Sequence, residues 1–89
     1  MSYVIRAIGF AGNDPCPHAG QYLEDFDHHT PDGRGFGKFT SDPAKAKQFK
    51  ATSDAMIFWG TQSTTVPLRP DGKPNKPLTA LSISVEPVP

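Results

Sequence analysis

Disulfide bonds, an excess of one charge and long apolar runs are all missing from this sequence. Cys16 is the only cysteine among 89 residues, so an internal disulfide bond cannot form. Nine basic and nine acidic residues give a formal net charge of zero, which argues against general binding to nucleic acid or membranes through excess Lys and Arg. No apolar run approaches the length of a membrane span, and the N-terminal MSYVIRAIGF does not resemble a signal peptide. We therefore expect a protein of the reducing cytoplasm that does not contact membranes.

Apolar side chains are also scarce. They make up 36% of the chain, whereas ten prolines and eight glycines interrupt it. This balance predicts a single small domain, residues 1–89, with a modest core and long loops. The loops are expected at 11–20 and 63–77, where residues that break regular structure are concentrated.

The stretch GFGKFTSDPAKAKQF, residues 35–49, changes its period in the middle. Its first part alternates as a strand does. Asp42 is a helix-capping residue type, and Pro43 suits the first helical position because a missing N–H has no consequence there. We therefore expect a strand followed by a short helix from Pro43 to about Phe49, with Ala46 on its apolar edge.

Three further segments follow the period of a strand, and one follows that of a helix. The strands are expected at residues 3–10, 21–27 and 78–86. A second helix is expected from Asp54 to about Gln62, capped by Ser53 or Asp54. The order β-β-β-α-α-β predicts an α+β fold, in which an antiparallel sheet of three to four strands carries two short helices on one face.

Alternation within these segments assigns side chains to the core. Bulky residues on both faces make 3–10 an inner strand. In the last strand, Leu81, Ile83 and Val85 are expected to face inward and the intervening serines outward. In the second helix the residues spaced for the core are Ala55, Phe58 and Trp59.

The strand over 21–27 contains most of a cluster of acids. Tyr22, Glu24 and Phe26 are expected on one side of this strand, and Leu23 and Asp25 on the other. No Lys or Arg interrupts the acids, which are Glu24, Asp25, Asp27 and Asp32. Such a surface can compete for the basic groove of a nucleic-acid enzyme by presenting carboxylates where phosphates would lie.

Two charged segments are the predicted binding surfaces for a partner. The first is the acidic strand and turn, 24–34, and the second is the loop 69–76, whose prolines lower the entropy lost on docking. Their candidate contact residues are Glu24, Asp25, Asp27, Asp32, Arg34, Arg69, Lys73 and Lys76. The alternative is an ordinary solvated surface on which charges cluster by accident.

The four residues Cys16, His18, His28 and His29 are of the types that bind zinc. Their spacing is not a standard one, and adjacent histidines on a strand point to opposite faces, so both could bind only from a loop. As a nucleophile, Cys16 lacks a nearby helix N-terminus to lower its pKa and a third group to orient a base. We therefore predict no metal, no cofactor and no catalytic residue.

Arg34, Phe36, Lys38 and Phe39 interleave basic and aromatic side chains. This pattern is typical of proteins that bind single-stranded nucleic acid. The alternative, which the zero net charge favours, is that Phe36 or Phe39 belongs to the core.

Four stretches carry a resemblance to a known group of proteins. They are GQYLEDFD, GRGFGKFTSDPAKAKQF, AMIFW and RPDGKPNKPLTALSISVEP, and together they cover most of the chain. In this combination the chain resembles small uncharacterised proteins encoded by bacteriophages and prophages of proteobacteria. The resemblance implies a phage accessory protein in a bacterial cytoplasm. Many such proteins bind and block a host protein, including defence nucleases and CRISPR complexes.

The sequence and the resemblance together predict a protein that is not an enzyme. The expected function is to bind and inhibit a host protein, with a host or phage protein as the partner. The alternative is a small nucleic-acid-binding protein that uses the basic second half of the chain.

Overall fold

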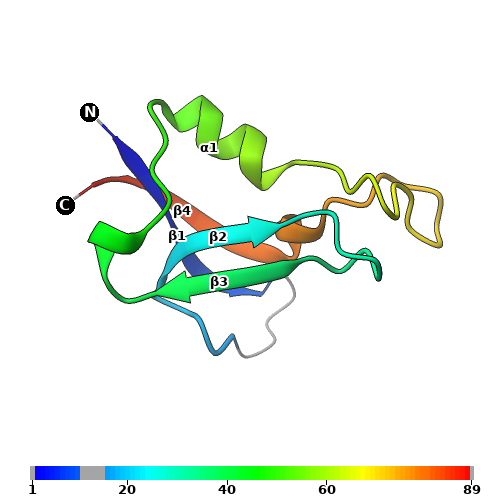
Figure 1. Cartoon of the computed structure of the whole chain (residues 1–89), viewed down its shortest axis with the longest axis horizontal. Helices are drawn as coiled ribbons and strands as arrows, with labels where there is room; N and C mark the ends of the chain where they lie inside the picture. The colour runs from blue at the N-terminus through cyan, green and yellow to red at the C-terminus, as the bar shows by residue number, and fades with distance from the viewer. Residues whose placement is uncertain (1, 11–15, 89) are drawn as a thin grey trace.

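Four strands form one antiparallel sheet in the computed structural model, which describes residues 2–10 and 16–88. The strands are β1 (Tyr3–Phe10), β2 (Tyr22–Asp27), β3 (Phe36–Thr40) and β4 (Leu81–Pro87). Their spatial order is β3-β2-β1-β4 (Figure 1). The expectation that 3–10 forms an inner strand is therefore confirmed. Of the loop expected at 11–20, residues 11–15 lie outside the described residues.

One face of the sheet packs against the helix α1 (Thr52–Trp59). The buried cluster between them consists of Ile5, Leu23, Phe49, Ala55, Leu78 and Leu81. As expected, Phe58 and Trp59 pack against this cluster, and the Trp59 indole N–H donates to the Leu81 carbonyl at 3.0 Å. The predicted α+β class, built on an antiparallel sheet, is thus confirmed.

The first predicted helix is wrong, because only a 3-10 turn, η1 (Pro43–Lys45), forms there. The cap is as expected: the Asp42 carboxylate accepts the Ala44 N–H at 3.0 Å. Ala46, however, already has an extended backbone. Ala46 and Phe49 lie in two different buried clusters instead of on one helical edge. Phe49 also exchanges two backbone hydrogen bonds with Tyr3, at 2.8 and 2.9 Å, which an extended chain allows and a helix would not.

The second helix begins and ends earlier than expected. It covers Thr52–Trp59, and its N-cap is Ala51, which has no side-chain capping bond. The last strand also begins later than expected, at Leu81, since Pro77 starts a second 3-10 turn, η2 (Pro77–Ala80). Beyond it the expected alternation is confirmed: Ile83 and Val85 pack against the core, and Ser82 is exposed.

A bulge in β2 reverses part of the predicted side-chain assignment. Leu23 pairs with Phe39, but the next pair is Asp25 with Lys38, so Glu24 is the additional residue. Phe26 therefore lies on the same side as Leu23, against the core, and not beside Glu24. The same shift places Asp25, with Glu24 and Asp27, on the outer face of the sheet. A regular alternation cannot produce this arrangement.

Candidate functional site

The turn between β2 and β3 is fixed by one carboxylate. Asp32 accepts the Thr30 hydroxyl at 2.7 Å and the Arg34 backbone N–H at 3.0 Å. The Gly35 N–H donates to the Thr30 hydroxyl at 2.9 Å. The Arg34 N–H and then the Thr30 hydroxyl hold the pKa of Asp32 below its usual value. Asp32, expected as a contact residue, thus shapes the turn that presents Arg34.

The Pro-rich segment 61–76 lies beside this turn, and both project from the same end of the sheet (Figure 1). Asn75 joins them. Its side-chain amide donates to the Gly33 carbonyl at 2.7 Å and to the Val66 carbonyl at 2.9 Å. The Asn75 backbone N–H donates to the Pro67 carbonyl, and the Asn75 carbonyl accepts the Ser63 N–H. Sequence reasoning missed Asn75, although an amide with two donors in a stretch poor in backbone N–H groups was the available signal.

A second set of contacts strengthens the same junction. The Thr64 backbone N–H donates to His29 Nδ1 at 3.1 Å. The Thr65 hydroxyl donates to the Thr30 carbonyl at 2.6 Å. Contacts from Thr64, Thr65 and Asn75 therefore hold the loop against the turn.

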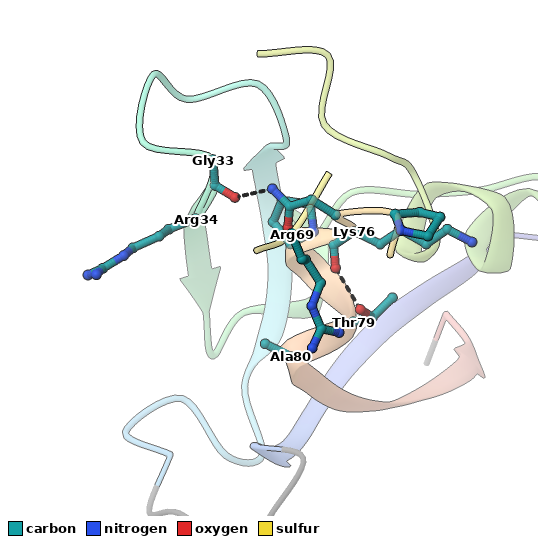
Figure 2. A pocket seen from close by; sticks show the side chains of 9 residues that line it. Gly33, Arg34, Arg69, Lys76, Thr79 and Ala80 are labelled. Carbon is teal, nitrogen blue, oxygen red and sulfur yellow. Dashed lines mark hydrogen bonds between the residues drawn. The ribbon is translucent and has the colours of Figure 1, made fainter. Parts of the chain in front are cut away.

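Between the turn and the loop is a hollow of about 520 Å³, here named the cationic hollow. Arg34, Arg69 and Lys76 line it together with polar groups of Asn75 and Thr79. Figure 2 shows Arg69 lying across the hollow toward Thr79, while the Arg34 side chain extends away from it. The sequence assigned Arg34 to one predicted surface and the other two cations to another. All three residues line this hollow, although the Arg34 side chain is directed out of it.

The charge around the cationic hollow is positive. Arg69 forms an ion pair with Asp71 at 3.0 Å, and both side chains are about half exposed. Such a pair contributes little to the free energy of folding. Among the described residues, Arg34 and Lys76 have no such ion pair, and no carboxylate lines the hollow. Lys73 is exposed near the end of the loop, where its carbonyl accepts the Arg69 N–H.

A second hollow, of about 310 Å³ and here named the aromatic hollow, adjoins the first. Arg34, Pro77 and Ala80 line both. The aromatic residues that line it are Phe10, His18, Phe26, Phe36 and Phe39. Phe36 pairs with Asp27, so its side chain is directed to the outer face of the sheet. The expectation that Phe36 or Phe39 belongs to the core is confirmed for Phe39, whereas Phe36 is 69% exposed. Phe39 does pack against the core, and His18 stacks on it with ring centroids 4.2 Å apart.

The cysteine and the three histidines have separate surroundings. Cys16 packs against the main core, and His18 lies in the aromatic hollow. His28 is buried between two phenyl rings, and its Nε2–H donates to the Phe58 carbonyl at 2.9 Å. Burial lowers the pKa of His28. Among the described residues, no group of three or more His, Cys, Asp or Glu side chains is arranged to hold a metal ion.

The remaining predicted contact residues are on the outer face of the sheet. Glu24 lies 4.0 Å from the Lys38 ammonium group. Asp25 and Asp27 are exposed, and each accepts a nearby backbone N–H, from Phe26 and His29 respectively. Three of the four predicted acids therefore lie away from the cations of the cationic hollow. Asp32 is the exception, because it is in the turn beside Arg34.

Comparisons with protein-family models, curated proteins and solved structures gave no match to this chain. In the part of the chain that the structure describes, every helix is too short or too polar to cross a bilayer.

Proposed function

We propose that this protein binds an anionic macromolecule at the cationic hollow and is not an enzyme. One observation carries the proposal. Arg34, Arg69 and Lys76 come from segments far apart in the sequence, yet they line one concave surface. A net charge of zero does not oppose this function, because the acids of β2 lie on a different surface and the local charge, not the total, acts on a bound group.

The lining of both hollows supports binding over catalysis. Within the described residues, neither hollow contains a carboxylate, a cysteine or a serine. His18 is the one histidine in these linings, and its Nδ1 lies 3.2 Å from the side-chain oxygen of Gln21. A nucleophile with its own base, as covalent catalysis needs, is not assembled among these groups.

The resemblance to phage and prophage proteins supplies the proposed setting. In a bacterial cytoplasm, a small protein of this kind would interfere with a host process by occupying a polyanion or a polyanionic protein segment. In this proposal Arg69 and Lys76 of the basic second half, with Arg34 of the turn, contact the partner, and the acids of β2 do not.

Retention on immobilised heparin, a soluble polyanion model, tests the proposal. We expect the protein to be retained at low salt and the double variant Arg69→Glu, Lys76→Glu to elute at clearly lower salt. Both side chains are exposed, so their replacement should leave the melting temperature nearly unchanged.

The matched control is the double variant Lys45→Glu, Lys50→Glu. It changes the net charge equally at two exposed lysines that line neither hollow. If the two double variants elute at the same salt concentration, or if the parent protein is not retained at all, the cationic hollow is not the site. The acidic outer face of β2 is then the remaining candidate for a protein partner.

A further inference from the structure

The strand β4 is an edge of the sheet, and among the described residues no strand pairs with its outer side. In an antiparallel pair, successive residues direct their backbone N–H and C=O alternately toward the partner strand and away from it. The neighbouring strand β1 shows which residues of β4 point outward. Tyr3 exchanges backbone hydrogen bonds with Phe49, so Tyr3 faces away from β4. Ala7 also faces away, because it accepts the Gly20 N–H and donates to the Gln21 carbonyl.

Ile83 and Val85 present the backbone groups of this free edge. Ile83 pairs with Ala7, and Val85 pairs with Ile5. Ile5 is two residues from Ala7 along β1, so it also faces away from β4. Both residues of such a pair turn their N–H and C=O groups away from each other. In the described part of the chain, no other backbone group bonds to those of Ile83 and Val85.

The two ends of β4 are closed to further pairing. The Leu81 N–H donates to the Leu78 carbonyl. The Leu81 carbonyl accepts the Trp59 indole N–H at 3.0 Å. At the other end, Pro87 has no N–H to donate. The free edge therefore offers two N–H and two C=O groups, all of them from Ile83 and Val85.

A second copy of β4 matches these groups. In an antiparallel pair of copies with Ser84 opposite Ser84, Ile83 of each copy lies opposite Val85 of the other. Each of these two pairs can exchange two N–H···O=C bonds, so every outward group of both copies is satisfied. A pair centred on Ile83 would instead bring the occupied Leu81 opposite Val85. A pair centred on Val85 would bring Pro87, which has no N–H, opposite Ile83.

The side chains also suit the pairing centred on Ser84. Ile83 and Val85 pack against the core, so branched apolar side chains meet on the inner face. On the outer face, Ser84 meets its own copy and Ser82 meets Glu86. No two like charges face each other, and such charges are what most often oppose a strand pair.

The opposite edge of the sheet does not have this property. Lys38 is the middle residue of β3, and its side chain is 71% exposed. Two copies of β3 paired about their centres would place Lys38 opposite Lys38. A lysine on an edge strand is a common means of preventing association of this kind. Of the two edges, β4 is therefore the one that accepts a second copy.

We propose that two copies of this chain associate through their β4 edges, with a two-fold axis at Ser84, and join two four-stranded sheets into one. Residues 82–86 line neither hollow, so this contact does not depend on the proposed polyanion site. Only two residues of each copy exchange hydrogen bonds. The contact is therefore of the small, transient class, and the dimer should form reversibly at high protein concentration.

Sedimentation equilibrium tests the association. Between about 10 μM and about 1 mM, a range that covers the dissociation constants of weak contacts, the average mass of the parent should rise toward that of a dimer. Ser84→Lys and Ser84→Glu should each weaken association about tenfold or more, since like charges then meet at the axis. An equimolar mixture of the two variants should restore the dimer, because a lysine then faces a glutamate. Recovery in the mixture also shows that both variants are folded.

Ser82→Lys is the matched control. It adds the same charge as Ser84→Lys, on the same face of β4 and two residues away. In the proposed pairing its partner is Glu86, so this variant should dimerise at least as well as the parent. If Ser82→Lys weakens association as much as Ser84→Lys does, the two-fold axis is not at Ser84 and the proposal is wrong.

Amide hydrogen exchange in the parent tests the same pairing without any substitution. Protection of the Ile83 and Val85 amides should increase with protein concentration. The Ser84 amide faces β1, where Ser84 pairs with Arg6, so its protection should not change with concentration. A parent that stays monomeric up to about 1 mM, or Ile83 and Val85 amides that gain no protection, would overturn the proposal. So would a mixture of Ser84→Lys and Ser84→Glu that remains monomeric.

Discussion

Replacement of Gly35 by Ala tests the packing of the turn that presents Arg34 and Phe36. Gly35 has a φ of +77°, in the region that disfavours any residue with a Cβ. A Cβ atom at this position would also overlap the Phe26 ring and approach Pro77 Cβ to 2.9 Å. Phe26 and Pro77 both line the aromatic hollow, so relief of this overlap must move the walls of the site.

The expected loss of stability has two parts. Left-handed backbone costs about 1–2 kcal/mol for a residue other than glycine. Overpacking against a ring and a proline that are fixed by their neighbours costs about 1–3 kcal/mol more. Gly35→Ala should therefore lower the free energy of unfolding by about 2–5 kcal/mol, a large part of the roughly 5–15 kcal/mol typical of a domain.

Gly72→Ala is the matched control. Gly72 has a φ of +82°, but no described atom lies within 4 Å of the place its Cβ would take. Gly72→Ala should therefore lose only the free energy that the left-handed backbone costs a residue other than glycine. Urea denaturation followed by circular dichroism measures the free energy of unfolding of both variants.

The difference between the two variants isolates the contact of Gly35 with Phe26 and Pro77. If Gly35→Ala is no less stable than Gly72→Ala, the turn does not pack against these residues. The packing of Gly35 against Phe26 and Pro77, two residues that line the aromatic hollow, would then be refuted.

Two further predictions concern groups that join parts of the fold. His28 has a lowered pKa because it is buried, so between its native pKa and the unfolded value near 6.5 the unfolded chain binds more protons. The free energy of unfolding should therefore be constant above about pH 6.5 and fall as the pH drops below that value. His28→Gln should lose this fall. An unchanged pH profile in the variant would contradict the burial of a neutral His28. Asn75→Asp removes both amide donors to the Gly33 and Val66 carbonyls, so urea denaturation should show a loss of about 1–3 kcal/mol. A variant as stable as the parent would mean that the loop is held by other contacts.

The sequence could predict those parts of the fold that depend on residues close together in the chain. Ile83 and Val85 alternate with serines, and a regular alternation fixes the inner face of β4 without reference to other strands. The Asp42 cap was predicted for the same reason, because its acceptor role depends on the next two residues. The helix predicted after it does not form, since the Tyr3 backbone, from a distant part of the chain, makes hydrogen bonds with Phe49.

The candidate site was only partly predictable. Its cations could be named from the sequence, but charge alone does not indicate that Arg34 and Arg69 line one hollow. The bulge at Glu24 has no local signature, and it separates Phe26 from the acids of the same strand. Phe36 could be identified as part of an aromatic and basic pattern, but its exposure depends on how β3 pairs with β2.

The attachment of the Pro-rich loop has a consequence for how this protein can change. Its cations are on a segment that Asn75 joins to the turn by hydrogen bonds, outside the buried cluster of the sheet and α1. Substitutions at Arg69, Lys73 or Lys76 can therefore alter what is bound with almost no effect on folding. The charge of this surface can therefore change through a single loop while the buried cluster stays as it is.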